Sequence, residues 1–473
     1  MISWRNDMNR ERDLLKNTLI LSIGTFLPKF VSLITLPILT ACLTKEEYGT
    51  YDLVTVLVSL VLPAATLQIQ TAAFRFLIDI REDEEKTKEI ISSIFAFILP
   101  ISMFMLMILF FILPGKRFDR LLVCLYFLVD ILVNSCRQIV RGLKKNLDYS
   151  ISAIISAIGK MVFVVIFVWY LKTGLTGAVL ALLAASSISL FVLFVRTKLY
   201  SYIDLKMIRI PVIRKMLSYS LPMVPNQLSM WVMKTSDRFV VTSVLGLSAN
   251  AVYGVANKIP SILNLAQSTF TMAWHENASM ASKDEDSAEY YTSMFASVFD
   301  LTAGFLGLLI GMTPLLFALL IRGDYEESLV QMPFLFLGVF FCCQSTFLGG
   351  IYVAYKDTKS VGITTMIAAA FNFAIDIILI RRIGLYAASI STMVSYILLF
   401  VFRVYDVRKL VDIRFDLKHI VIVTCVLAFE SVIFYLKKPL LSMVNMLIGI
   451  VLFVLLNREK IIFLWKKGKE RFF

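Results

Sequence analysis

The chain has 473 residues, of which 58% are hydrophobic and only 17% are charged, and its mean hydropathy is +0.79. This composition excludes an ordinary soluble globular domain. The net charge of +13 would suit a nucleic-acid partner. However, no stretch between the apolar runs is long enough to form the soluble domain that such binding requires, so we expect no nucleic acid.

Apolar runs follow one another along the whole chain, and each has the roughly twenty residues that a helix needs to cross a bilayer. They predict an all-α, polytopic membrane protein with about fourteen transmembrane helices. The predicted spans are 17–43, 50–78, 91–113, 119–140, 151–171, 175–195, 216–242, 249–275, 291–320, 330–354, 361–380, 385–405, 419–436 and 440–456.

Lys and Arg residues are concentrated in the tails and in every second loop. Because cytosolic loops of membrane proteins carry an excess of these residues, this placement explains the net charge. It predicts a multi-pass protein with both termini in the cytosol, including the basic tail "LWKKGKERFF".

Two pairs of matching segments suggest an internal repeat. The first is "EEYGTYDLV" (46–54) with "NAVYGVANK" (250–258), and the second is "LKTGLTGAV" (171–179) with "RRIGLYAAS" (381–389), at nearly the same offset. Because six helices return the chain to the same side of the membrane, both copies of a duplicated six-helix unit have the same orientation in the membrane, as in parallel-repeat transporters. The predicted parts are an N-lobe (1–200), a C-lobe (201–410), and a two-helix segment with the cytosolic tail (411–473).

Spans one, two, seven and eight carry polar side chains at helical spacing. Such residues either hydrogen-bond between helices or line a water-accessible cavity. The length of the stripes, on equivalent helices of both halves, favours a cavity. The candidate lining residues are Ser22, Thr25, Ser32, Thr55, Ser59, Thr66, Gln70, Asn226, Asn257, Ser261, Asn264 and Ser268.

The same four spans carry five basic residues: Lys29, Arg75, Lys234, Arg238 and Lys258. At ~1.5 Å per residue, Lys29 lies roughly 20 Å from either end of its span, beyond the reach of its side chain. Arg75 could instead anchor the inner interface, and Asp237 could neutralise its basic neighbours at helical spacing. A cavity with surplus positive charge would select an anion, typically a phosphate.

Enzyme chemistry finds little support in the sequence. There is no HExxH motif and no Walker glycine loop, and "DED" (284–286) is best explained as a solvated acidic loop. We therefore expect no catalytic residue, no metal site and no cofactor.

Four segments resemble the Wzx-type polysaccharide flippases: "LPKFVSLITLPIL", "LTKEEYGTYDLV", "YSLPMVPNQLSMWVMKTSDRFVV" and "YGVANKIPSILNLAQSTFTMAW". These flippases belong to the multidrug/oligosaccharidyl-lipid/polysaccharide (MOP) exporter superfamily. The resemblance implies two lobes in a V shape that open alternately. It also implies a bacterial cytoplasmic membrane and an undecaprenyl-diphosphate-linked oligosaccharide, moved to the outer leaflet for surface polysaccharide. By position, it places the five basic residues in the lumen.

The resemblance further implies coupling to an ion gradient or to the membrane potential, with Asp237 and Asp300 as candidate coupling groups. Membrane lipids, a polysaccharide polymerase and glycosyltransferases are the implied partners. Three alternatives stay open. They are a lipid II flippase, a MATE-like drug/cation antiporter with an acidic lumen, and, from another class, a membrane polysaccharide polymerase or acyltransferase.

Overall fold

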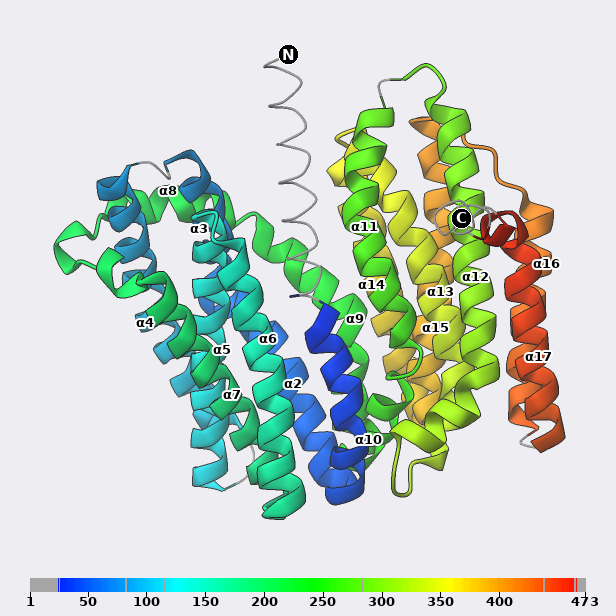
Figure 1. Cartoon of the computed structure of the whole chain (residues 1–473), viewed down its shortest axis with the longest axis horizontal. Coiled ribbons are helices and arrows are strands. Elements are labelled where there is room, and N and C mark those ends of the chain that lie inside the picture. The colour runs from blue at the N-terminus through cyan, green and yellow to red at the C-terminus, as the bar shows by residue number, and fades with distance from the viewer. Residues whose placement is uncertain are drawn as a thin grey trace. The chain divides into compact units, whose positions relative to one another are not determined.

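The computed structural model describes residues 24, 26–80, 83–113, 116–282, 284–436, 439–462 and 465, which are almost entirely helical and contain no strand (Figure 1). A first helix covers Phe26–Cys42. It is followed by α2 (Lys45–Thr66), α3 (Ile69–Asp79), α4 (Glu84–Ile112), α5 (Arg117–Gly142), α6 (Asn146–Phe163) continued by a π-helix (Val164–Tyr170), α7 (Gly174–Thr197), α8 (Ile210–Ser220), α9 (Met223–Leu245), α10 (Leu247–Ala256), α11 (Ser261–Ala281), α12 (Ser287–Leu320), α13 (Glu326–Ala354), α14 (Thr358–Ile383), α15 (Leu385–Asp406), α16 (Leu417–Tyr435) and α17 (Pro439–Leu456).

Every predicted span coincides with one or two of these helices. Within the described ranges, ten helices are long and apolar enough to cross a membrane, and shorter apolar helices cover Phe26–Cys42, Ile69–Ile78 and Leu440–Leu456. The prediction of an all-α, multi-pass membrane protein is confirmed.

The chain forms two compact units, Met1–Trp231 and Val232–Phe473. In the first, α5 and α6 pack on α7, and α8 packs on α3 and α4 (Figure 1). In the second, α13 contacts α10, α11, α12, α14, α15 and α16, and 78% of its most apolar stretch is buried. Helix α13 is therefore the core of the second unit. The predicted division at residues 200 and 410 stays a prediction.

A capping box begins α2. The Glu47 amide donates to Thr44 Oγ1 (3.2 Å), and the Thr44 amide donates to Glu47 Oε2 (2.9 Å). Glu47 Oε1 also accepts from the amide of Leu175 in α7 (3.3 Å). Gly174 has a φ of 60°, and a Cβ there would lie 2.5 Å from Glu47 Oε1, so glycine is required. Two segments of the sequence repeat thus meet in the first unit.

The matching glycine of the second unit has the same backbone conformation. Gly384 precedes α15 with a φ of 59°. The matching tyrosines, Tyr48 and Tyr253, are 1% and 3% exposed. The repeated segments therefore have similar local structure in both units.

Two of the predicted polar spans are broken helices. Between α2 and α3, Leu67 and Gln68 adopt left-handed φ values of 49° and 59°, one turn after Pro63. Between α10 and α11, a turn over 257–260 ends at Pro260. Non-helical backbone at membrane depth is tolerated where protein buries it or where it lines a water-filled cavity. Broken helices of this kind form the binding sites of many transporters.

Candidate functional site

In the first unit, basic and amide side chains accompany the break between α2 and α3. Lys29 is exposed on the helix over 26–42, and Arg75 is exposed on α3. Gln70 is 3% exposed, and its Oε1 receives no hydrogen bond from the described residues. Gln68 Oε1 accepts from the Thr71 hydroxyl (2.9 Å). The break therefore gathers polar groups that an uninterrupted apolar helix would not bury.

The predicted hydroxyl residues of the first unit bond within their own helix. Thr55 donates to Asp52 O (2.7 Å), Ser59 to Val56 O (2.6 Å) and Thr66 to Leu62 O (2.7 Å). These three bonds therefore do not link one helix to another. Ser59 also accepts a hydrogen bond from the indole of Trp231 (3.1 Å). Ser32 is half-buried. Ser22 and Thr25 lie outside the described residues.

In the second unit, the break between α10 and α11 contains a basic residue. Lys258 is half-buried in this turn, and Arg238 is half-buried on α9. Asn257 donates to Tyr253 O (2.9 Å) and Ser261 to Lys258 O (2.7 Å), while Asn264 is exposed. The side chains of Asn226, Lys234 and Ser268 lie outside the described residues. Each unit therefore has a broken helix with a basic residue in or just after the break.

A buried acidic cluster joins α9, α10, α14 and α15 within the second unit. Asp237 is 3% exposed and Asp376 is 0% exposed. Asp237 Oδ2 accepts from the Tyr253 hydroxyl (2.7 Å) and the Thr392 hydroxyl (2.5 Å). Asp376 Oδ1 accepts from the Ser391 hydroxyl (2.5 Å). The two carboxyl groups are close neighbours, because they accept from the adjacent hydroxyl residues Ser391 and Thr392 of α15.

The remaining oxygens of the pair, Asp237 Oδ1 and Asp376 Oδ2, receive no hydrogen bond from other residues in the described ranges. Two carboxylates this close in a buried site cannot both stay ionised without a compensating positive charge. The surrounding donors are oxygen atoms, and no three His, Cys, Asp or Glu side chains gather anywhere in the described part of the chain. The cluster therefore has the chemistry for a proton or a small monovalent cation, because hard cations prefer oxygen ligands.

The other predicted coupling residue, Asp300, lies in a different cluster. Its Oδ1 is 2.7 Å from His419 Nε2 of α16, and its side chain is 23% exposed. Its main-chain oxygen accepts from Asn457 Nδ2 (3.2 Å). Asp376, in contrast, is not among the predicted site residues, because its span is not one of the four selected for their long polar stripes. The available signal was a lone carboxylate within an apolar span, which is by itself a functional indication.

Two further arginines, one buried and one half-buried, also escape the sequence pattern. Arg403 of α15 is 5% exposed, and its guanidinium donates to Ser345 O (2.5 Å) and the Thr365 hydroxyl (3.0 Å). Arg137 of α5 donates to the hydroxyl and the carbonyl of Ser152 (both 3.0 Å). Both use neutral acceptors on neighbouring helices, so they connect helices within one unit.

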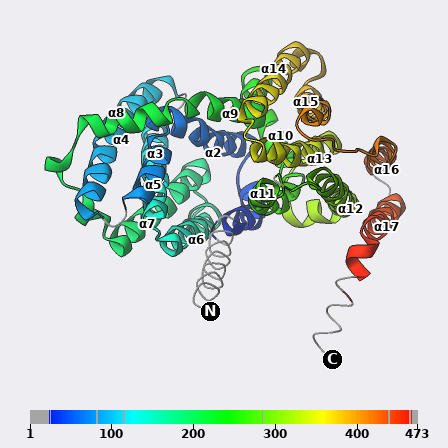
Figure 2. The ribbon, with the colours of Figure 1, turned by 90° about the horizontal axis from the view of Figure 1, so that it is seen from above.

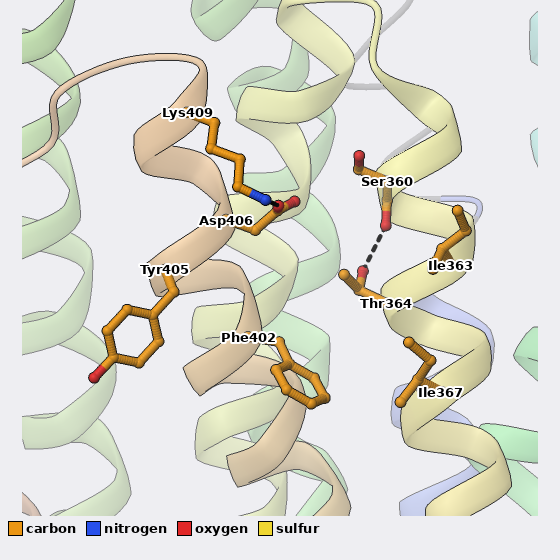
Figure 3. A pocket seen from close by; sticks show the side chains of 8 residues that line it. All are labelled: Ser360, Ile363, Thr364, Ile367, Phe402, Tyr405, Asp406 and Lys409. Carbon is orange, nitrogen blue, oxygen red and sulfur yellow. Dashed lines mark hydrogen bonds and ion pairs between the residues drawn. The ribbon is translucent and has the colours of Figure 1, made fainter.

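A pocket of about 460 Å³ lies between α14 and α15 (Figure 3). One end is polar, where Lys409 Nζ approaches Asp406 Oδ1 (2.8 Å). The other end is apolar and includes Ile367 and Phe402. A second cavity, of about 620 Å³, lies in the first unit between α4, α5 and α7 and is mostly apolar. None of the five predicted basic residues lines either of these two cavities.

Residues 14–275, more than half of the chain, match the family described as "Polysaccharide biosynthesis protein". The chain belongs to this family. No curated protein sequence matches it.

Several solved structures share the fold. A lipid II flippase, MurJ, in an inward closed conformation has a TM-score of 0.70 at 16% identity, over 94% of this chain and 100% of that chain. A MATE multidrug transporter of the MOP superfamily matches in its inward-facing conformation with a TM-score of 0.64 at 16% identity, over 82% of this chain and 95% of that chain. An outward-facing MATE transporter matches with a TM-score of 0.56 at 16% identity, over 84% and 95%.

The chain thus belongs to the polysaccharide biosynthesis family and shares the fold of a lipid II flippase and of a MATE transporter of the MOP superfamily. The family member described here is therefore a multi-pass membrane protein with the fold of these transporters. The finer assignment to the Wzx type stays a prediction.

Proposed function

We propose that this protein is a transporter that moves an undecaprenyl-diphosphate-linked oligosaccharide from the inner to the outer leaflet of a bacterial cytoplasmic membrane by alternating access. The observation that carries the proposal is the set of basic residues at exposed or half-buried positions on broken or polar spans. Lys29 and Arg75 occupy such positions in the first unit, and Lys258 does so in the second. Both termini would lie in the cytosol.

The proposed substrate has three parts that need three environments. The diphosphate would contact the basic residues, because ammonium and guanidinium groups are the usual partners of phosphate. Hydroxyl and amide groups such as Ser59 and Asn264, both exposed, would contact the sugar. The polyprenyl tail would remain in the bilayer with the membrane lipids. A polysaccharide polymerase would then receive the sugar on the outer side.

The buried pair Asp237 and Asp376 is our candidate for ion coupling. A cation or proton that binds there changes the net charge between α9 and α14. Such a ligand can shift a conformational equilibrium only by its difference in affinity for the two states. The ion would bind the carboxyl groups of this pair, so the proposed basic substrate contacts would remain available to the diphosphate.

A lipid II flippase is the second candidate, favoured by the fold match that spans 94% of this chain. A MATE-like antiporter is the third, favoured by the buried acidic pair. The three substrates differ in a testable way, because lipid II and the oligosaccharide lipid are anionic whereas the drugs of a cation antiporter are cationic.

The test is reconstitution of the full-length protein into vesicles with each of three labelled substrates: the oligosaccharide lipid, lipid II and a cationic dye. We expect translocation of the oligosaccharide lipid. Translocation of the dye alone would refute the proposal. In cells, deletion should leave lipid-linked repeat units on the cytosolic side. If translocation stays normal and only polymerisation is lost, the protein is not the flippase.

A further inference from the structure

Helices α12, α16 and α17 meet at a seam that has no known part in transport. In Figure 2, α16 and α17 lie next to each other beside α12, and all three pairs of helices are in contact. Three glycines of α12, Gly304, Gly307 and Gly311, lie on the face that packs on α17. A Cβ on Gly311 would lie 2.7 Å from Met446 Cα, and one on Gly449 would lie 2.5 Å from Gly307 O. The two backbones are therefore in direct contact, with no room for water between them.

Glu430 of α16 lies at this seam and is 0% exposed. A Cβ on Gly307 would lie 3.1 Å from Glu430 Oε2 and 3.0 Å from Leu452 Cδ2, so the carboxyl group is directed between α12 and α17. Both carboxyl oxygens receive no hydrogen bond from any residue in the described ranges. The carboxyl is therefore buried among glycine and leucine with none of its usual partners.

A second unsatisfied acceptor lies nearby on α17. Asn445 is 2% exposed, and its Nδ2 donates to the main-chain oxygen of Glu430 (3.1 Å). Its Oδ1 receives no donor among the described residues. Because buried acceptors are normally satisfied, the seam lacks one donor, and a proton on the carboxyl would supply it.

No charged side chain compensates Glu430 within the described part of the chain. On α12 the nearest acid is Asp300, roughly two turns from Gly307, and it already pairs with His419 of α16. Lys460, beyond α17, donates to Ser297 O (2.7 Å) and Asn457 Oδ1 (3.1 Å) instead. The stretch 328–354 of α13 and the whole of α17 contain no Asp, Glu, Lys or Arg.

A metal ion does not fit this site, because it would find one carboxylate among apolar neighbours rather than several oxygen ligands. An ionised carboxylate would be an unpaired charge in the membrane interior, which is strongly disfavoured. A proton needs only the carboxyl itself and one acceptor.

We propose that Glu430 is a proton-binding site, and that the bound proton keeps α16 and α17 packed on α12. The protonated carboxyl donates within the seam, with Asn445 Oδ1 as the available acceptor. Loss of the proton leaves a charge that must reach water, and this requires α17 to separate from the glycine face of α12. Helix α16 keeps other contacts, the pair of His419 with Asp300 of α12 and the bond from Tyr435 to Val330 O of α13 (2.6 Å). The loosening therefore concerns α17.

Infrared spectroscopy of the full-length protein in lipid nanodiscs tests the protonation state directly. We expect the carbonyl band of a protonated carboxylic acid that shifts when the protein is made with isotope-labelled glutamate, which separates it from Asp376 and Asp237. Glu430→Gln should remove this band, and Asp376→Asn should leave it. If the wild-type protein shows no labelled acid band near neutral pH, the proposal is wrong.

Hydrogen exchange tests the mechanical consequence. After correction for the intrinsic pH dependence of exchange, amides near 442–452 should exchange several-fold faster at alkaline pH in the wild-type protein. Glu430→Gln should abolish this difference, because the amide keeps a donor at every pH. An equal pH response in both proteins would overturn the proposal.

If Glu430→Gln does not fold, Asn445→Leu replaces it as the test variant. It retains Glu430, and the infrared band of the protonated acid should move to the frequency of a carbonyl with a weaker hydrogen bond. An unchanged frequency would remove Asn445 as the acceptor and contradict the proposed seam.

Discussion

Replacement of Asp376 by Asn separates the charge of the buried pair from its shape. The amide has the size of the carboxylate and retains an oxygen that accepts from Ser391, now 2.5 Å from Asp376 Oδ1. Two unit charges about 4 Å apart repel by ~4 kcal/mol at an effective dielectric constant of ~20. The wild-type protein must offset this repulsion with a proton or cation, whereas Asp376→Asn has only one charge in the cluster. Without a bound cation, the variant should therefore be at least as stable as the wild-type protein, although transport should fall.

The size of the effect follows from linkage. A cation that binds only the folded state, present at ~100 times its dissociation constant, stabilises that state by ~2.7 kcal/mol. For a unit of this size, each kcal/mol shifts the melting temperature by ~2–4 °C, so the wild-type melting temperature should rise by about 5–10 °C. The variant should show little of this rise. If the ligand is a proton, the wild-type protein should instead become more stable as the pH falls.

The assay is thermal unfolding of the purified full-length protein at constant ionic strength. The melting temperature in sodium, lithium or potassium is compared with that in a bulky organic cation, at mildly acidic and at mildly alkaline pH. Asp300→Asn is the control, because it breaks the pair with His419 outside the cluster. It should lower the melting temperature and preserve the response to the cation. The reasoning is refuted if the wild-type melting temperature depends on neither cation nor pH, or if Asp376→Asn responds as the wild-type protein does.

Three further predictions concern packing and substrate contact. Gly311→Leu should destabilise the second unit by about 1–3 kcal/mol, because its Cβ would lie 2.7 Å from Met446 Cα. The control is Gly362→Ala in α14, where no atom lies within 4 Å of the new Cβ. This variant should be neutral or stabilising in the same unfolding assay. Arg403→Met should lower the free energy of unfolding by about 2–4 kcal/mol, because it leaves Ser345 O and the Thr365 hydroxyl without their buried donor. A melting temperature equal to the wild-type value would contradict this prediction. Lys29→Gln should reduce flipping of the diphosphate lipid at normal expression while Lys29→Arg retains part of it, and full activity of Lys29→Gln would rule out a phosphate contact there.

The sequence by itself determined the class, the spans and the family. This was possible because lipid offers no hydrogen bonds to the backbone, so each crossing needs one long apolar helix that hydropathy reveals. The glycine pair Gly174 and Gly384 of the predicted repeat shares a φ near 60°, a value that restricts the residue type. Asp237 became a coupling candidate through the family resemblance, and that role stays a prediction.

Only the tertiary structure decided what these residues do together. The partner of Asp237 is Asp376, far along the chain, and Asp300 pairs with His419 instead. At the left-handed break, Leu67 and Gln68 are neither glycine nor proline, and Pro63 one turn earlier does not by itself give the break. Glu430 looks like any isolated acid until Gly307 and Asn445 are seen around it. Periodicity within one helix shows which face is polar, but which faces meet is set by packing between helices, and no single helix encodes that.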